Sequence, residues 1–294
     1  MFERMKAHFL FEGLLKRHDI SQAYKMVGPE DSWYDTITTV HRSLAQIQNL
    51  PHEDWCVESH DGLTLKALYY HGTSDKTMIW IHGYTSHAER ESAFPGLFYH
   101  SLGYNVLIPY LRAHGPSEGK YISFGPLESM DLKLWVNKVN ARHPNGGILL
   151  HGLSMGGGIA LDLATQELPN VKGLVVDAPS YSIEDFFHGV SHYNFKKHPE
   201  KAFRSLCHRF QKEFGADVHG FDRVQNIKKG RYPLLLSAGS MENMDEVLNK
   251  IKENNPHKST VVILPGCNHG NGMYKQTKLY QDAIQAFLYE NFER

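Results

Sequence analysis

Short apolar runs alternate with helical patterns along most of the chain from residue 53 onward. The first two runs alternate apolar and polar residues and flank Asp61-Gly62, a dipeptide typical of a tight hairpin turn. The next six are continuously apolar, which is the pattern of strands covered by helices on both faces of a sheet. The eight expected strands are 53–59, 63–70, 77–82, 104–109, 147–151, 172–177, 232–237 and 260–265.

Helical patterns fill the intervals between these strands, for example at 127–141, 156–168 and 274–292. Strands that alternate with helices indicate a mostly parallel sheet, which the antiparallel hairpin enters from one side. The predicted fold class is therefore α/β, with an eight-stranded, mostly parallel sheet and helices on both of its faces.

Two parts of the chain lie outside this alternation. The first has apolar residues at helical spacing among charges of mixed sign, so we expect an N-terminal helical extension over 1–52. The second, 181–231, separates the sixth strand from the seventh and is rich in Phe, His and Lys. Its composition predicts amphipathic helices with an aromatic face. The α/β core should then comprise 53–180 and 232–294.

Composition narrows the range of functions. The chain has 294 residues, and 31 Lys and Arg against 32 Asp and Glu give a net charge of −1. This balance predicts no attraction to nucleic acid or to an anionic membrane. The 3 cysteines cannot all pair, and their wide separation excludes a disulfide scaffold and a zinc ribbon. We therefore expect a reducing compartment.

Charged residues run through the first 20 positions, where a secretory signal needs an unbroken apolar stretch. No run elsewhere reaches the ~18 apolar residues of a membrane span. These observations predict a cytoplasmic protein without integral membrane contact, and a homodimer stays possible. The 19 histidines raise a metal hypothesis, but we find no HExxH motif and no i, i+4 histidine pair in a ligand-like context. We expect no metal and no cofactor.

The candidate chemistry begins at Gly152-Leu153-Ser154-Met155-Gly156, which follows the fifth apolar run and precedes a helical pattern. This is G-x-S-x-G in the strand-turn-helix setting of a nucleophile elbow. The turn is sharp, and small residues two before and two after the serine let strand and helix approach each other. Ser154 is therefore the candidate nucleophile.

A serine nucleophile needs a base for its proton and donors for the oxyanion that forms when it attacks a carbonyl group. His269 follows the eighth strand on a short glycine-containing loop. It should lie at the same edge of the sheet as Ser154, because ligands of open α/β sheets bind at the carboxyl ends of the strands. The backbone amides of Tyr84, after the third strand, and Met155 are the candidate oxyanion donors.

These motifs together resemble the α/β-hydrolase superfamily over about 53–292. The matching sequences are HGY after the third strand, LRAHGPSEG after the fourth, GLSMGG at the elbow and GCNH after the eighth. The chain is similar to bacterial serine esterases and lipases of the monoacylglycerol-lipase and cinnamoyl-esterase type. Their helical cap lies between strands six and seven, which corresponds to 181–231 here.

The resemblance implies the α/β-hydrolase fold, with Ser154 as nucleophile, His269 as base and the Tyr84 and Met155 amides as oxyanion donors. It also implies a serine hydrolase that cleaves small-molecule acyl esters through an acyl-enzyme intermediate. We expect the cap to overhang Ser154 and to wall an apolar acyl pocket with its aromatic side chains. Those side chains are Phe186, Phe187, Tyr193, Phe195, Phe203 and Phe210.

The acid of the triad is open at this point. The family pattern H-G-x-x-D after the seventh strand corresponds here to SAGSME at 237–242. Alignment on Gly239 makes Glu242 the leading candidate, while Asp245 and Asp177 are alternatives. The unclear acid also leaves room for a ligand-binding homologue without turnover, and the same triad serves thioesterases, acyltransferases and serine peptidases.

Overall fold

The computed structural model describes residues 2–18 and 30–293. Within these ranges one eight-stranded sheet has the order β1-β2-β4-β3-β5-β6-β7-β8. β2 pairs antiparallel with β1 and β4, and the other neighbours pair in parallel. The predicted α/β fold is confirmed. The strands are β1 (His52–Glu58), β2 (Thr64–Tyr70), β3 (Thr77–Ile81), β4 (Asn105–Pro109), β5 (Ile148–Leu153), β6 (Val171–Asp177), β7 (Leu234–Gly239) and β8 (Ser259–Leu264).

The turn between β1 and β2 forms where Asp61-Gly62 predicts it. Gly62 has φ +81°, a conformation that glycine adopts without a steric penalty. Its N–H donates to the Ser59 carbonyl at 3.0 Å, and the Ser59 N–H donates to the Leu63 carbonyl at 2.9 Å. The local sequence therefore determines the hairpin that begins the sheet.

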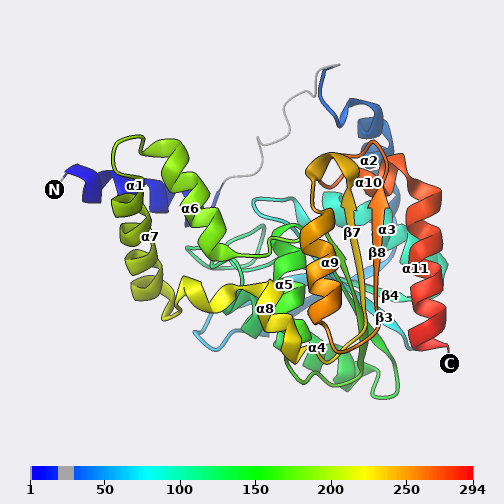
Figure 1. Cartoon of the computed structure of the whole chain (residues 1–294). Helices are drawn as coiled ribbons and strands as arrows, with labels where there is room; N and C mark the ends of the chain where they lie inside the picture. Colours follow the sequence, from blue (N-terminus) through cyan, green and yellow to red (C-terminus); the bar gives the residue numbers. More distant parts are fainter. Residues whose placement is uncertain (1, 19–29, 294) are drawn as a thin grey trace.

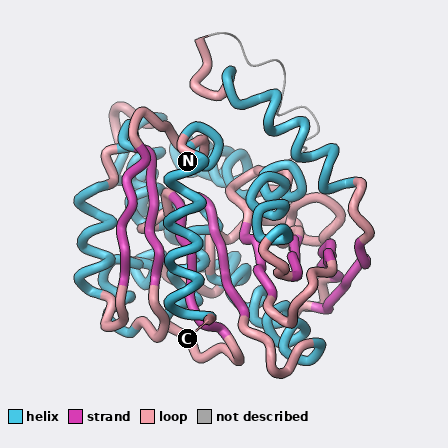
Figure 2. Tube along the Cα trace, turned by 90° about the vertical axis from the view of Figure 1, so that its right-hand side faces the viewer, coloured by secondary structure: helices cyan, strands magenta, loops and turns pink. Residues whose placement is uncertain are grey.

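Helices cover both faces of the sheet, with α11 on one side and α5 and α9 on the other (Figures 1 and 2). The centre of the sheet is buried: all residues of β3, β4 and β5 belong to the core. The helices of the α/β core are α3 (Ala88–Ser101), α4 (Pro126–Arg142), α5 (Met155–Ala164), α9 (Asp245–Asn254), α10 (Gly272–Lys275) and α11 (Thr277–Phe292).

Two of the expected helices have different bounds. The helix expected at 156–168 ends at Ala164, because the Leu168 N–H donates instead to the Tyr232 hydroxyl at 2.7 Å. The helix expected at 274–292 is divided into α10 and α11 at Gln276, whose side chain donates to the Pro265 carbonyl at 3.0 Å. In both places a contact with a distant segment interrupts the local pattern.

Helices contact β8 from both faces of the sheet, as expected: α9 lies on one side and α11 on the other. β8 lies at the edge of the sheet, and Val261, Val262 and Ile263 are only partly buried. An apolar run predicts a strand, but it does not distinguish an edge position from a central one.

Two further groups of helices lie at the N-terminus and between β6 and β7. α1 (Phe2–Leu15) packs against α7, and α2 (Ile37–Gln48) packs against α3. Figure 1 shows α1, α6 and α7 together on the side of the molecule away from the sheet. Of the expected extension 1–52, residues 1 and 19–29 lie outside the described residues. The segment between β6 and β7 contains α6 (Ile183–Asn194), α7 (Pro199–Phe214), η3 (Val218–Phe221), α8 (Arg223–Asn226) and η4 (Ile227–Lys229).

A buried arginine joins this inserted segment to the core. The Arg223 guanidinium donates to both carboxylate oxygens of Asp162 on α5, at 2.9 and 2.8 Å. It also donates to the backbone carbonyls of Ser180, at 2.7 Å, and Phe124, at 2.6 Å. Bidentate pairing fixes the relative orientation of the two side chains as well as balancing their charges.

None of the described helices is long and apolar enough to cross a membrane.

Candidate active site

Ser154 lies at the turn between β5 and α5. Its backbone has φ 59° and ψ −116°, which is a strained conformation for a residue with a side chain. A Cβ atom at Gly152 would lie 2.2 Å from the Gly156 carbonyl oxygen, and one at Gly156 would lie 1.8 Å from the Ile81 carbonyl oxygen. Both glycines are therefore required by the close approach of strand and helix. The turn presents the Ser154 hydroxyl at the carboxyl edge of the sheet.

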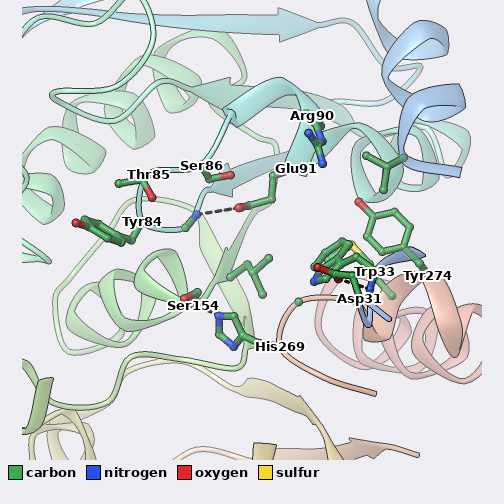
Figure 3. Close-up of a pocket in the computed structure, with 15 residues that line it drawn as sticks. Asp31, Trp33, Tyr84, Thr85, Ser86, Arg90, Glu91, Ser154, His269 and Tyr274 are labelled. Carbon is green, nitrogen blue, oxygen red and sulfur yellow. Dashed lines mark hydrogen bonds between the residues drawn. The ribbon is translucent and has the colours of Figure 1, made fainter. Parts of the chain in front are cut away.

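A continuous chain of hydrogen bonds begins at this hydroxyl. His269 Nε2 lies 2.9 Å from Ser154 Oγ, and His269 Nδ1 lies 2.6 Å from Glu242 Oε2. Figure 3 shows the imidazole of His269 beside Ser154. The second carboxylate oxygen of Glu242 accepts the Gly239 N–H at 2.8 Å, which fixes the orientation of the carboxylate. The structure thus brings together Ser154, His269 and Glu242, three of the residues predicted from the sequence.

The electrostatics of these groups fit a base held by a carboxylate. The Glu242 side chain is 9% exposed, whereas that of His269 is 56% exposed. The hydrogen bond to Glu242 raises the pKa of His269 above its ordinary value of 6.5. A proton accepted by His269 is therefore stabilised where it arrives.

The two alternative acids lie elsewhere. Asp177 is buried, accepts a hydrogen bond from Ser237 Oγ, and lies 3.0 Å from His151 Nε2. Its remaining partner is the Tyr280 hydroxyl. Asp245 is exposed and begins α9. Of the three candidates, only Glu242 is hydrogen-bonded to His269 among the described residues.

The residues predicted to supply the oxyanion donors lie near Ser154: Met155 follows it in the chain, and Tyr84 lines the same cavity. Met155 is the first residue of α5, so no carbonyl within the helix accepts its N–H. Tyr84 follows Gly83, where an added Cβ atom would lie 3.5 Å from the Ser154 Cβ. The Tyr84 hydroxyl donates to the Leu14 carbonyl, and its ring lies 4.9 Å from that of Phe124. The end of α1 therefore holds the loop that contains Tyr84.

A buried carboxyl group supports this loop from behind. Glu91 on α3 accepts the Gly83 N–H at 3.0 Å (Figure 3). It also accepts the Trp80 indole N–H at 3.0 Å. Burial raises the pKa of Glu91 to about 7. Sequence reasoning did not single out Glu91, because nothing in the helical pattern 88–101 distinguishes it from an exposed glutamate.

Two cavities meet at Ser154 and His269. The first has a volume of about 380 Å³, and its lining combines apolar side chains, among them Trp33, Leu153 and Tyr274, with the charged side chains of Asp31, Arg90 and Glu91. Figure 3 shows Trp33 and Tyr274 on the side of the cavity opposite Tyr84. The second has a volume of about 790 Å³ and a polar lining. Its charged side chains are Glu184, Asp185, Asp222, Glu242, Glu246 and Lys250.

Comparison with protein families gives a match between residues 72–212 and the model described as Hydrolase_4: Serine aminopeptidase, S33. An esterase of Pyrococcus furiosus has a similar structure, with a TM-score of 0.64, 25% identity, and coverage of 91% of this chain and 97% of that chain. The chain has the α/β-hydrolase fold. The esterase Est1E of Butyrivibrio proteoclasticus, solved with ferulic acid, shares this fold at 19% identity. Its TM-score is 0.62, and the match covers 82% of this chain and 100% of Est1E.

Curated relatives resemble only part of the hydrolase. A repeats-in-toxin protein of Vibrio vulnificus is 33% identical over 132 residues, which are 42% of this chain and 2% of the toxin. The protein YqkD of Bacillus subtilis is 35% identical over 127 residues, which are 41% of this chain and 40% of YqkD. The chain thus spans less than half the length of these relatives.

The six aromatic side chains expected to wall the acyl pocket line neither of the two cavities at Ser154, and Tyr181 is the aromatic residue of the insertion that lines the second one. This expectation is wrong for a physical reason: α6, α7 and α1 pack against one another and use those side chains as their own core. Phe187 and Phe210 are 0% exposed with ring centroids 5.4 Å apart, and Phe195 packs with Ala7. Tyr193, by contrast, is 78% exposed.

The apolar wall of the first cavity comes from the N-terminal segment instead. Trp33 lies edge-on to Tyr274, with ring centroids 5.7 Å apart. Asn271 joins the two segments, because its side chain donates to the Ser32 carbonyl at 3.0 Å and accepts the Asn268 N–H at 2.9 Å. Sequence reasoning missed Trp33, since a single tryptophan in a polar stretch gives no indication of its partner.

Metal-ligating side chains also come together outside this site. His188 and His192 are an i, i+4 pair on α6, and α7 brings Glu200 beside them. The sequence does not reveal this pair as a set of metal ligands, because the carboxylate belongs to a different helix. The described residues give no metal ligand set around Ser154.

Proposed function

We propose that this hydrolase cleaves small-molecule carboxylic esters through a covalent acyl-enzyme intermediate. Ser154 is the nucleophile, His269 the general base and Glu242 the acid that orients it. The observation that carries the proposal is the hydrogen-bond chain from Ser154 Oγ through His269 to Glu242, at 2.9 and 2.6 Å. Nucleophile, base and orienting acid within hydrogen-bond reach are the signature of nucleophilic catalysis.

The reaction proceeds in two steps. Ser154 Oγ attacks the ester carbonyl while His269 Nε2 accepts the hydroxyl proton. The oxyanion that forms accepts hydrogen bonds from the backbone N–H groups of Tyr84 and Met155. His269 then gives the proton to the leaving alkoxide, which departs as an alcohol and leaves the acyl group on Ser154. Water, deprotonated by His269, attacks the acyl carbonyl in the second step, and the carboxylic acid departs as Ser154 regains its proton.

We infer the orientation of the substrate from the two cavities. The first, smaller cavity has an apolar wall that contains Trp33 and Tyr274, and it also includes the loop of Tyr84. This wall suits the acyl chain. The larger polar cavity on the other side suits the alcohol and its exit to solvent. The insertion, 181–231, contributes Glu184 and Asp222 to this polar side, and we propose that it acts as a cap over the leaving group.

Labelling with a fluorophosphonate tests the nucleophile. We expect the wild type to be labelled and to hydrolyse p-nitrophenyl esters, and Ser154→Ala to lose labelling and to lose roughly 10⁶-fold in kcat. Ser101→Ala is the matched control, because Ser101 is exposed on α3 and its hydroxyl donates to the Phe98 carbonyl at 2.7 Å. Equal labelling of the wild type and Ser154→Ala would refute the assignment.

Amide cleavage is the second candidate, and two observations favour it. The matched family is described as serine aminopeptidase, and carboxylates outnumber cations around the polar cavity, which suits a substrate with a free amine. Paired p-nitrophenyl ester and aminoacyl p-nitroanilide substrates separate the two. Ester cleavage without anilide cleavage supports the esterase. A kcat/KM for the anilide that equals or exceeds that for the ester would replace the esterase by a peptidase.

The alternative of a binding protein without turnover depended on the absence of a clear acid. Glu242 in contact with His269 removes that argument. A complete set of nucleophile, base and acid supports turnover.

A further inference from the structure

Three side chains with metal-ligating atoms converge on the outer surface of the insertion. His188 and His192 lie one turn apart on α6, so they project from the same face of the helix. Glu200 is the second residue of α7, and its Oε1 lies 3.1 Å from His188 Nε2 and 3.0 Å from His192 Nε2. All three ligand atoms lie within 4.8 Å of one another.

Two of the three separations between these atoms are close to those in the first coordination sphere of zinc. Zinc binds His nitrogen and carboxylate oxygen at about 2.0–2.1 Å with tetrahedral geometry, which places neighbouring ligand atoms roughly 3.3 Å apart. The two N···O distances here are 3.1 and 3.0 Å. Small side-chain rotations are therefore enough to admit an ion between them.

The surroundings also suit a metal site. The His188 ring packs edge-on against Phe203, with centroids 5.0 Å apart, and Phe203 is 8% exposed. This contact limits the orientation of the first imidazole. The side chains of His188, His192 and Glu200 are 46%, 49% and 54% exposed. An ion can therefore enter from solvent and keep a water molecule as its fourth ligand.

We propose that His188, His192 and Glu200 bind one zinc ion, which cross-links α6 to α7. Two imidazole nitrogens and one carboxylate oxygen form a donor set that suits zinc and the neighbouring transition metals, whereas magnesium prefers oxygen ligands. The site is separate from Ser154, so the proposal is independent of the reaction that the hydrolase performs. Its consequence is structural: the loop between the two helices is closed by the ion.

Isothermal titration calorimetry tests the site on the full chain after treatment with a chelator. We expect one zinc ion per chain, with no heat from magnesium at the same concentration. His192→Gln and Glu200→Gln should each weaken zinc binding by about tenfold or more, because each removes one of only three protein ligands. His208→Gln is the matched control: His208 is an exposed histidine about two turns further along α7, and its variant should bind zinc as the wild type does.

Thermal unfolding gives a second readout. A ligand at 100 times its Kd raises the melting temperature of a chain of this size by about 5 °C when it binds only the folded state. We expect this rise in the wild type and His208→Gln, and a much smaller one in His192→Gln. Zinc binding and stabilisation that persist unchanged in both His192→Gln and Glu200→Gln would overturn the proposal, as would the absence of binding to the wild type.

Discussion

Replacement of Glu242 by Gln tests the triad most sharply, because both partners of the carboxylate are donors. Glu242 Oε1 accepts the Gly239 N–H at 2.8 Å, and Oε2 accepts from His269 Nδ1 at 2.6 Å. A glutamine offers one oxygen and one NH₂ group, so its NH₂ must face one of these donors. The backbone N–H cannot lose its proton, whereas the imidazole can change its tautomer. The NH₂ group will therefore face His269 and force the proton onto Nε2.

The magnitude follows from this tautomer and from the lost charge. His269 with a proton on Nε2 cannot accept the proton of Ser154, 2.9 Å away. The carboxylate also stabilises the imidazolium by about 4 kcal/mol, taking charges about 4 Å apart and an effective dielectric constant of about 20. This amount alone is roughly 10³-fold in rate, and comparable Asp→Asn changes in triads cost about 10⁴. We expect kcat to fall by about 10³ to 10⁴.

The assay is the pH dependence of kcat/KM for a p-nitrophenyl ester, together with thermal unfolding. His269 must be neutral to act as a base, so activity should rise with pH through its pKa. Because Glu242 raises that pKa above 6.5, the midpoint for the wild type should lie above 6.5, and Glu242→Gln should move it downward. The melting temperature should change little, since the variant keeps the shape of the side chain.

Two matched variants complete the experiment. Asp245→Asn removes an exposed carboxylate three positions away and should keep full activity. Asp177→Asn disturbs the buried bonds to Ser237 and Tyr280 and should lower stability more than it alters the pH midpoint. Full activity and an unchanged midpoint in Glu242→Gln would refute the reasoning, and a collapse of activity in Asp245→Asn would transfer the role to that residue.

Two further predictions concern residues around the reacting groups. Trp33→Ala removes an apolar wall and should raise KM for long-chain esters by about tenfold, while KM for acetate esters changes little. Its control is Tyr34→Ala, which changes an exposed neighbour. Equal effects on esters of all chain lengths would contradict this prediction. Burial raises the pKa of Glu91 from 4.5 to about 7, so the folded state holds a proton that the unfolded state loses. The contribution of Glu91 to the free energy of unfolding should be complete below pH 4.5 and should fall by about 3 kcal/mol as pH rises through 7. Urea unfolding from pH 5 to 9 checks this, because Glu91→Gln should flatten the decline, and parallel declines would show that another group titrates.

The parts of the site that the sequence predicts are those determined by local geometry. A Cβ atom added at Gly152 or Gly156 would lie only 2.2 or 1.8 Å from a backbone carbonyl oxygen, so a five-residue motif is enough to locate Ser154. Glu242 was harder to locate because its position depends on where β7 ends. The strand continues to Gly239, whose N–H donates to Glu242, and this bond supports the alignment on Gly239.

The parts that the sequence does not predict depend on contacts between distant segments. The aromatic residues of α6 and α7 indicate an apolar face but not the surface that it covers, and that surface includes α1. Phe11 of α1 lies 6.2 Å from Phe214 of α7, ring to ring. In the same way, His188 and His192 reveal no third ligand until the fold brings Glu200 beside them.

The family match covers some residues of the site and not others, and the difference follows from which segment supplies each residue. The matched range, 72–212, contains Ser154 and the two proposed oxyanion donors, which follow the ends of central strands. Glu242, His269 and Trp33 lie outside that range, and Trp33 comes from a segment before the sheet begins. Asn271 connects that segment to the loop of His269, so one side chain holds both the apolar wall and the proposed base. If the proposed function is correct, the nucleophile belongs to the shared core, whereas the choice of acyl group depends on the contact between residues 30–36 and 268–274. Substrate comparisons should therefore begin at that contact.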